Sequence, residues 1–328
     1  MTETISSTPL DRWTAVWLAH QRALGRDYGS AQWILRHLQR FQAQISAIDL
    51  TQNGFDLWCD SFRNLSPTTR RQRQLVVRTF CLYRRRTEPA CFVPDPLYFV
   101  RLCPYRRPFI IEPEQIVRML VAADALPPTP TSPLLPAITR SAIVLLYTAG
   151  LRRGELVRLT LDDVSPSTGV LRIRASKFHK SRLVPLSSDA SNELRAYLCK
   201  RLAPIFDTGP HSTLLCNMRG RQRGYTGAGI AEAIQRMYAA ANVVDSEHRR
   251  PRVHDMRHSF AVNALVRWYR ESADVQSNLP RLAMYMGHVS IVSTAHYLHF
   301  VPTLRALASD RFEQSFGNSF RRYQHDPL

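Results

Sequence analysis

The 328-residue chain carries 44 lysines and arginines against 26 acidic residues, a formal net charge of +18. With 45% hydrophobic residues it has the composition of a globular protein rather than a disordered one, and its length allows two domains. Such an excess of positive charge favours a polyanionic partner, either nucleic acid or an anionic membrane. A basic surface that is merely solvated is the alternative.

Several classes of protein are disfavoured by local features. The longest apolar run, near residues 142–149, is far shorter than a membrane span, and the polar N-terminus does not resemble a signal peptide. The cysteines form no CxxC pair, which argues against a disulfide framework and a zinc site; they are Cys59, Cys81, Cys91, Cys103, Cys199 and Cys216. We therefore expect a cytoplasmic, nucleoid-associated protein with no membrane contact, no metal and no cofactor.

Residues 1–9 read as a tail, and residues 10–88 as an all-helical domain. Apolar residues recur at helical spacing in two segments: Trp13, Val16, Trp17 and Leu24 in the first, and Ile34, Leu35, Leu38 and Phe41 in the second. No strand pattern interrupts them.

Ser66 and Pro67 are typical of a helix N-cap followed by proline at the first helical position. The helix that they open is predicted to bury Leu75, Val76 and Phe80. Its other face is dense in arginine without evident acidic partners, which favours contact with phosphates over a simply solvated face. The predicted DNA-contacting residues there are Arg70, Arg71, Arg73, Arg78 and Arg84, with Arg85 and Arg86 beyond them.

Residues 89–111 contain five prolines and are predicted to be a linker. A second domain, residues 112–301, mixes helices with a small β hairpin. Residues 112–125 predict a helix with acidic residues at its start, residues 138–150 a buried helix ending at Gly150, and residues 152–164 another helix. Leu171 and Ile173 alternate with arginines, as in a strand, and residues 183–187 predict its partner. Residues 213–217 predict a further small strand, and helices fill most of the remainder.

Residues able to act together on a phosphate occur in a fixed order along the second domain. Arg152 comes first, then Lys177, then His254 and Arg257, which share a helix face three residues apart. Gly287-His288 and Tyr297 follow. Arginines can hold a phosphate through two hydrogen bonds each, and a tyrosine oxygen can attack it.

The segments AGLRRGEL, SKFHKSRLVPL, HDMRHSFA and MGHVSIVSTAHY resemble, in order and spacing, the tyrosine recombinase (phage integrase) family of Xer and integrase-like proteins. The resemblance implies a mainly α fold with a small antiparallel β-sheet in the catalytic domain. It also implies that the N-terminal domain is an all-helical, SAM-like core-binding domain.

The resemblance further implies a role for each residue. Arg152 and Arg257 would each grip a non-bridging phosphate oxygen, with Glu155 supporting Arg152. His288 would donate a hydrogen bond, His254 would accept or relay the phenol proton, and Tyr297 would be the nucleophile. Lys177 would protonate the departing 5′-hydroxyl. The glycines usual beside this lysine are replaced by Ser176 and Phe178, so Lys180 is an alternative general acid, or both lysines touch phosphate.

Plainer interpretations of single residues also exist. Tyr297 could be a core aromatic, with Ile291, Ala295 and Leu298 on the buried side of its helix, and His288 could cap a helix. His254 and His258 are spaced like a metal pair, but no carboxylate or cysteine completes a zinc site, so His258 is interpreted as a structural or supporting residue.

The function implied is site-specific DNA recombination through a 3′-phosphotyrosine, without metal or ATP, for a mobile element or phage. The implied partners are double-stranded DNA and other recombinase copies, either as a homo-tetramer on two DNA sites or as a hetero-oligomer with a related recombinase. A type IB topoisomerase-like enzyme is one alternative, and an inactive DNA-binding relative acting as a repressor or accessory factor is another. Residues 302–328 are predicted to contain a helix that engages a neighbouring protomer or packs on its own domain.

Overall fold

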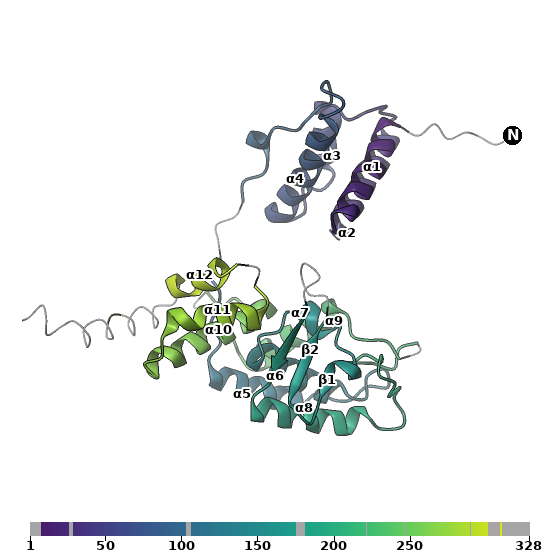
Figure 1. The fold of residues 1–328 in the computed structure, drawn as a ribbon. Coiled ribbons are helices and arrows are strands. Elements are labelled where there is room, and N and C mark those ends of the chain that lie inside the picture. The colour runs from purple at the N-terminus through teal and green to yellow at the C-terminus, as the bar shows by residue number, and fades with distance from the viewer. Residues whose placement is uncertain are drawn as a thin grey trace, which may run out of the picture. The chain divides into compact units, whose positions relative to one another are not determined.

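The computed structural model describes residues 8–25, 29–102, 106–174, 181–220, 222–245, 247–288, 290–300 and 309. The chain forms two compact units, Met1–Arg106 and Arg107–Leu328 (Figure 1). The described part of the chain holds no helix that is both long and apolar enough to cross a membrane.

The first unit consists of four α-helices and a short 3₁₀ helix. These are α1 (Pro9–Ala23), α2 (Gly29–Gln44), α3 (Gln52–Asp60), α4 (Pro67–Arg84) and η1 (Pro96–Tyr98). The predicted start of α4 is confirmed, since the Ser66 side chain accepts a hydrogen bond from the Thr69 amide and Pro67 occupies the first turn. Thr8 and Asp11 cap α1 reciprocally in the same region of sequence where the tail was predicted to end.

Large aromatic and aliphatic side chains fill the core of this unit. Trp17, Trp58 and Phe80 are essentially inaccessible, whereas Val16 and Leu24 are exposed despite their helical spacing. On α4 the prediction is wrong for Leu75, which is 43% exposed. The buried face of α4 differs from the predicted one and comprises Gln74, Val77, Phe80, Cys81 and Arg84.

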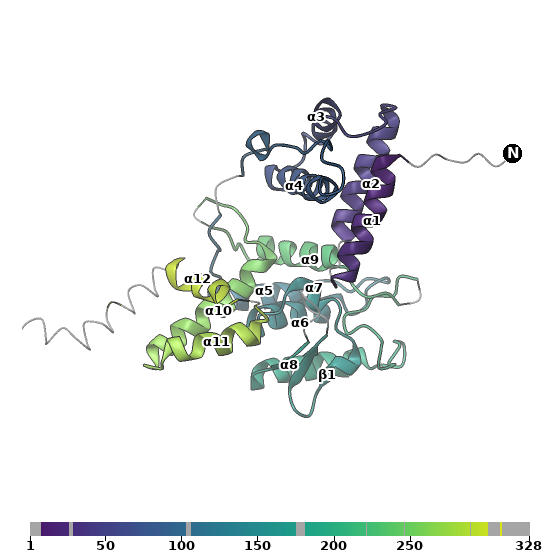
Figure 2. The same ribbon diagram turned by 45° about the horizontal axis from the view of Figure 1, so that its top comes forward.

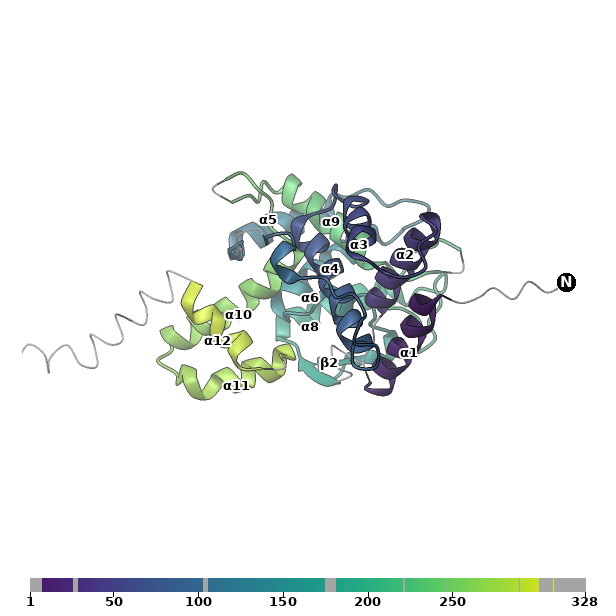
Figure 3. The ribbon, with the colours of Figure 1, turned by 90° about the horizontal axis from the view of Figure 1, so that it is seen from above.

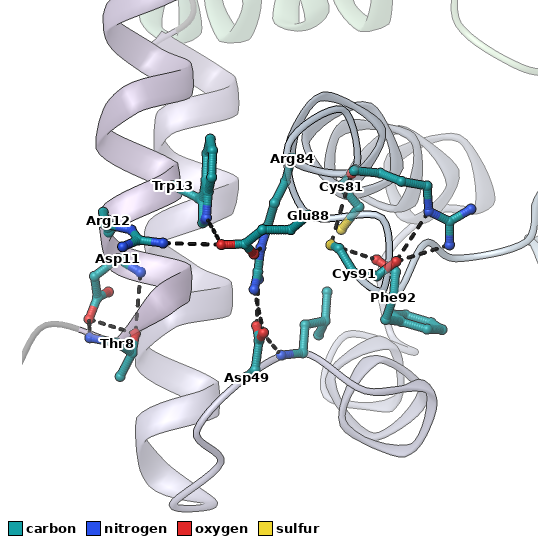
Figure 4. Close-up of polar contacts among 12 residues, drawn as sticks. Thr8, Asp11, Arg12, Trp13, Asp49, Cys81, Arg84, Glu88, Cys91 and Phe92 are labelled. Carbon is teal, nitrogen blue, oxygen red and sulfur yellow. Dashed lines mark hydrogen bonds and ion pairs between the residues drawn. The ribbon is translucent and has the colours of Figure 1, made fainter.

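Arg84 is an internal ion-pair partner, which corrects the prediction that the arginines of α4 lack acidic partners. Its guanidinium donates to Asp49 at 2.6 Å and to Glu88 at 2.6 Å, and only 6% of its side chain is exposed. Glu88 also accepts from the Trp13 indole at 2.7 Å and from Arg12 at 3.1 Å (Figure 4). A side chain held in this way stabilises the domain and is not available to DNA.

Two other arginines of α4, and Arg85 at its C-cap, are fixed to residues 91–100, the first part of the predicted linker. Arg71 donates to the carbonyl of Val100 at 3.0 Å, Arg78 donates to that of Pro94, and Arg85 donates to that of Cys91 at 2.9 Å. Cys91 and Phe99 belong to the hydrophobic core of the unit. The chain therefore packs as part of the first unit well beyond residue 88.

The second unit is mainly helical and contains one small sheet. Its elements are α5 (Pro113–Asp124), α6 (Leu135–Thr148), α7 (Arg153–Leu156), η2 (Leu161–Asp163), β1 (Val164–Ser165), β2 (Val170–Ile173), β3 (Arg182–Pro185), α8 (Ser188–Arg201), α9 (Gly227–Ala240), α10 (Val253–Arg270), α11 (Val275–Met286) and α12 (Val292–Phe300). The strands pair antiparallel in the order β1-β2-β3, with Leu171 opposite Val184. The predicted mainly α fold with a small antiparallel sheet is confirmed.

The predicted helix over residues 152–164 is wrong in its length. Helix α7 ends after Leu156, because the following backbone bonds to another segment: the Leu214 amide donates to the Leu159 carbonyl at 2.8 Å, and the Leu161 amide to the Ser212 carbonyl at 2.9 Å. The predicted strand over residues 213–217 is likewise reduced to isolated bridges at Thr213 and Cys216. The partners of these segments lie too far along the chain for local sequence to reveal them.

Two apolar clusters hold the second unit together. The larger one surrounds α6, whose buried residues Ile143, Leu145 and Leu146 contact neighbouring helices on all sides. The smaller one joins α10, α11 and α12, which lie side by side at one side of the unit (Figures 2 and 3). Tyr297 belongs to this second cluster, so the end of α12 is packed against the helix that carries His254 and Arg257.

Candidate active site

A sharp turn after α6 delivers Arg152 to the start of α7. Gly150 adopts a left-handed conformation, with φ of 58°, and a Cβ there would lie 2.5 Å from the Phe260 ring, so only glycine fits. Arg152 is the N-cap of α7. Its amide donates to Glu155 at 2.9 Å, and its guanidinium pairs with the same carboxylate at 2.8 Å.

Glu155 lies beneath two arginines. Its side chain is 2% exposed and also receives two parallel hydrogen bonds from Arg182, each of 2.9 Å. Burial alone would raise the pKa of this carboxyl, but the bonds from Arg182 and Arg152 outweigh it and lower the pKa to about 2. The carboxylate is therefore ionised and fixes the orientation of both guanidiniums.

Sequence reasoning missed Arg182. It is the first residue of β3, within the segment SKFHKSRLVPL, and its Nε also donates to the Tyr285 carbonyl at 2.7 Å. The signal in the sequence is an arginine at the start of a strand that is otherwise apolar. Its partner Glu155 lies 27 residues away, so spacing along the chain could not connect them.

Arg257 is almost completely buried, with 1% of the residue exposed. Its guanidinium donates to the carbonyls of Gly150 and Met286, which end α6 and α11 respectively. Burial, together with the nearby cation of Arg152, lowers the pKa of Arg257 to about 9. The second arginine of the predicted pair therefore lies beside the first and also holds two turns of the backbone in place.

Gly287 lies next to both Arg152 and Arg182. Its carbonyl accepts from Arg152 at 2.8 Å, and its φ of 66° is left-handed. A Cβ at this position would lie 2.8 Å from Nη1 of Arg182. The turn sets the direction of His288, whose Nδ1 is 2.7 Å from the hydroxyl of the buried Thr294 on α12.

Tyr297 points into the site. It is 5% exposed, its phenol oxygen is 2.9 Å from Nδ1 of His258, and its ring stacks against His288 at a centroid separation of 6.5 Å. The predicted buried face of α12 is wrong at Ile291, which is 49% exposed, while Thr294 is fully buried instead. The helix is thus rotated so that Tyr297 faces α10.

The imidazoles of His258 and His288 contact the tyrosine, and that of His254 contacts His258. The rings of His254 and His258 meet edge to face at 4.6 Å. Burial, then the charge of Arg257, lower the pKa values of His254 and of His288, the latter to about 4. Burial and His254 lower that of His258 to about 3. All three rings are neutral near pH 7 and can accept or donate hydrogen bonds there.

Six of the predicted residues therefore meet in the second unit: Arg152, Glu155, His254, Arg257, His288 and Tyr297. Lys177 and Lys180 lie outside the described residues. Arg70, Arg71, Arg73 and Arg78 lie in the first unit, where Arg73 stacks over the rings of Trp33 and Phe62 at 4.7 and 4.9 Å. Within the described residues, no three His, Cys, Asp or Glu side chains group so as to hold a metal ion.

The arrangement suits an anion with delocalised charge. Three guanidiniums, those of Arg152, Arg182 and Arg257, cluster around one ionised carboxylate, which leaves an excess of positive charge. Planar guanidiniums match the oxygens of a phosphate, and fixed positive groups stabilise the charge that builds up during attack at phosphorus. The phenol and the neutral imidazoles complete a site for phosphoryl transfer.

Comparison with known proteins agrees with this chemistry. The model of the phage integrase family matches residues 110–302. A putative integrase/recombinase of Sinorhizobium fredii, y4rB, is 34% identical over 291 residues, which cover 85% of this chain and 90% of the relative. The chain belongs to the phage integrase family. Membership makes it a DNA strand-transfer recombinase. A further relative, the tyrosine recombinase XerD of Vibrio vulnificus, is 27% identical over 247 residues, which cover 75% of this chain and 72% of that protein.

Solved structures share the fold of this phage integrase family member at low sequence identity. The integrase of transposon Tn1549 in complex with a circular intermediate DNA is 17% identical with a TM-score of 0.61, and the match covers 93% of this chain and 100% of that one. A lambda integrase dimer bound to a core site is 14% identical with a TM-score of 0.57, covering 87% and 94%.

Proposed function

We propose that Tyr297 is the nucleophile with which this recombinase cleaves double-stranded DNA at specific sites, forming a 3′-phosphotyrosine. The observation that carries the proposal is the position of the phenol oxygen: it is buried among imidazoles beside Arg257, which is itself adjacent to Arg152. A nucleophile of this kind needs its acceptor phosphate held by cations, and the neighbouring guanidiniums supply them.

In the proposed reaction, a phosphodiester binds with its non-bridging oxygens on Arg152 and Arg257. The phenol oxygen of Tyr297 forms a bond to phosphorus while the bond from phosphorus to the 5′-oxygen breaks. The phenol proton passes to or through His254, and His288 donates a hydrogen bond to the phosphate. Lys177, or Lys180 in its place, gives a proton to the departing 5′-oxygen.

Rejoining is the reverse reaction with a 5′-hydroxyl from another strand. The phosphotyrosine keeps one phosphodiester-like bond throughout, so the total number of phosphoester bonds is unchanged and no ATP is required. The residues proposed for each step bring their own charges and protons, and the scheme uses no metal ion or cofactor.

Access of DNA requires a local movement. Arg257 is 1% exposed and Tyr297 is 5% exposed in the described arrangement. A phosphate that touches both must therefore displace part of the turn after α11 or of α12. Such a step would couple DNA binding to assembly of the site, as in other enzymes that complete their site by conformational closure.

The proposed partners are double-stranded DNA and other copies of a recombinase, either four copies of this chain on two DNA sites or a mixture with a related protein. The proposed biological setting is a mobile element or phage. In support, a relative is named integrase/recombinase and a structural neighbour is a transposon integrase bound to DNA. An enzyme with this substrate works where the DNA is, so we place it in the cytoplasm at the nucleoid.

The proposal is tested with nicked duplexes cut from DNA that flanks the gene. Nicking lets the short 5′-hydroxyl strand diffuse away, so a covalent protein–DNA adduct accumulates. The wild-type protein should form adducts at a defined position, and Tyr297→Phe should form none while still binding DNA. Adducts with the Phe variant would refute the assignment of the nucleophile.

Two other outcomes would support different functions. Relaxation of supercoiled DNA of any sequence by a monomer would favour a topoisomerase-like enzyme. Specific binding without any cleavage would favour an inactive relative that acts as a repressor or accessory factor.

A further inference from the structure

We propose that His258 is a positioning residue for the nucleophile, because its Nδ1 accepts a hydrogen bond from the hydroxyl of Tyr297 and so aims the phenol oxygen toward the phosphate site. The inference rests on the proposed function of Tyr297 and adds a residue to it. His258 lies outside the set of residues assigned to the chemistry above.

Direct contact with the reacting atom distinguishes His258 from His288, which contacts the ring of the same tyrosine. Nδ1 of His258 and the phenol oxygen of Tyr297 are 2.9 Å apart, and the two rings meet at 63° with their centroids 5.4 Å apart. This distance is that of a full hydrogen bond. His288 touches the same tyrosine by ring stacking, while its own Nδ1 is directed to Thr294.

Helix α10 explains why His258 reaches the tyrosine. His258 lies four residues after His254, so the two rings lie one above the other on the same helix face, 4.6 Å apart. Residue 257 points to the other side, where it holds Gly150 and Met286. One helical turn thus presents an arginine to the phosphate site and an imidazole to the nucleophile.

The surroundings of His258 keep its ring neutral, and the tautomer that we propose sets the direction of the hydrogen bond. Burial, together with the cations of Arg252 and Arg257, opposes a positive charge on its ring, so the ring is neutral and carries one proton. With that proton on Nε2, Nδ1 is an acceptor and the phenol must donate to it. The phenol oxygen then keeps its lone pairs for phosphorus, and the same surroundings that keep His258 neutral make it a poor base. Its role is therefore to place the oxygen before attack. As the bond to phosphorus forms, the phenol O–H turns from His258 toward His254, the proposed acceptor of its proton.

Misplacing a reacting atom by about 1 Å can cost about 100-fold in rate. We therefore expect His258→Phe, which fills the space but offers no acceptor, to slow single-turnover formation of the covalent adduct by about 10- to 100-fold. DNA affinity should stay unchanged, since His258 touches the tyrosine and not the proposed phosphate ligands. His258→Asn places its side-chain oxygen near the position of Nδ1, so it should recover most of the lost rate.

A matched control exists on the same helix. The Asn263 side chain donates to the hydroxyl of Tyr147 at 2.9 Å, a half-buried phenol contact remote from the chemistry. Asn263→Leu removes a hydrogen bond of the same kind and should leave the rate of adduct formation unchanged. Equal rates for wild type and His258→Phe would overturn the proposal, and so would equal losses in the Phe and Asn variants, which would indicate a packing role.

A second measurement does not depend on cleavage or on a variant that folds poorly. In the full-length wild-type protein labelled with ¹⁵N-histidine, NMR should show His258 as the Nε2–H tautomer, with a Nδ1 resonance that moves in Tyr297→Phe. A proton on Nδ1 would overturn the proposal. If the NMR result holds but wild type forms no adduct on any DNA, the hydrogen bond stands and the proposed function fails.

Discussion

Glu155 and Arg182 form a bidentate ion pair in which both N···O distances are 2.9 Å, and this pair ties α7 to β3 next to Arg152. The same carboxylate holds Arg152. A single buried acid thus orients two guanidiniums that belong to distant parts of the sequence.

Replacing Glu155 with Gln should destabilise the catalytic domain and slow cleavage together. Loss of the charge leaves Arg152, Arg182 and Arg257 close to one another without compensation, at a cost of about 3 kcal/mol. Urea unfolding and the rate of adduct formation measure the two effects. Glu193→Gln is the matched control, because Glu193 also pairs with an arginine, Arg140, but is one-third exposed; it should cost less than about 1 kcal/mol. Similar losses in both variants would contradict this account.

Stability of the catalytic domain should fall as the pH drops from 6.5 toward 4. The folded-state pKa values of His258 and His288, about 3 and about 4, lie below the ordinary value of 6.5. Between pH 6.5 and 4 these histidines are protonated in the unfolded chain but not in the folded one, so acid favours unfolding. The free energy of unfolding should fall by up to about 1.4 kcal/mol per pH unit for each group.

Denaturant melts at pH 6.5, 5.5 and 4.5 measure this slope, and His258→Asn should make it shallower. Glu155 adds a separate loss of stability below pH 4.5. Its lowered pKa contributes fully to stability while the carboxyl is ionised in both the folded and the unfolded state, and this contribution is lost as acid protonates it. A stability that does not change between pH 6.5 and 4.5 would contradict the lowered histidine pKa values.

Gly287→Ala should disturb the packing of Arg152 and Arg182 against this glycine. The left-handed conformation costs alanine about 1 kcal/mol. Its Cβ would also lie 2.8 Å from Nη1 of Arg182. Gly25→Ala is a control with the same backbone strain, φ of 69°, but with no atom within 4 Å of the added Cβ. We expect Gly287→Ala to cost about 1–3 kcal/mol more than Gly25→Ala, from the overpacking alone, and to slow adduct formation as well.

In the first unit, Arg84→Met should lower stability by about 3 kcal/mol, because it leaves Asp49 and Glu88 without their shared buried partner. Arg86→Ala, at an exposed position on the same chain segment, should change stability little. Calorimetry measures the stability of both variants. The DNA affinity of Arg84→Met, measured at a temperature where it is folded, should equal that of the wild type. A specific loss of DNA affinity in Arg84→Met would restore the predicted contact with DNA.

Local chemistry made much of the fold predictable. Ser66 and Pro67 mark the start of α4, and the alternation of Leu171 and Ile173 with arginines marks β2, because caps and strand faces depend on neighbours only a few residues away. The order of the sequence motifs similarly identified six residues that the fold brings together.

Long-range partners account for what sequence could not predict. The role of Arg84 depends on Asp49, 35 residues earlier, and that of Arg182 on Glu155, 27 residues earlier. The charge pattern of α4 and its C-cap predicted arginines without partners in the protein. Several of them are instead bound to carbonyls of residues 91–100. The end of α7 was missed for the same reason, since its competitor is the backbone of residues 212–214.

The carbonyl contacts of Arg257 have a consequence for how such enzymes lose activity. This guanidinium joins the turn after α6 to the end of α11, so a substitution there removes a structural brace along with a proposed phosphate ligand. Tyr297 can become phenylalanine without removing any comparable support. In related proteins that bind DNA but no longer cleave it, the counterpart of Tyr297 should therefore be lost first, and the counterpart of Arg257 should be retained.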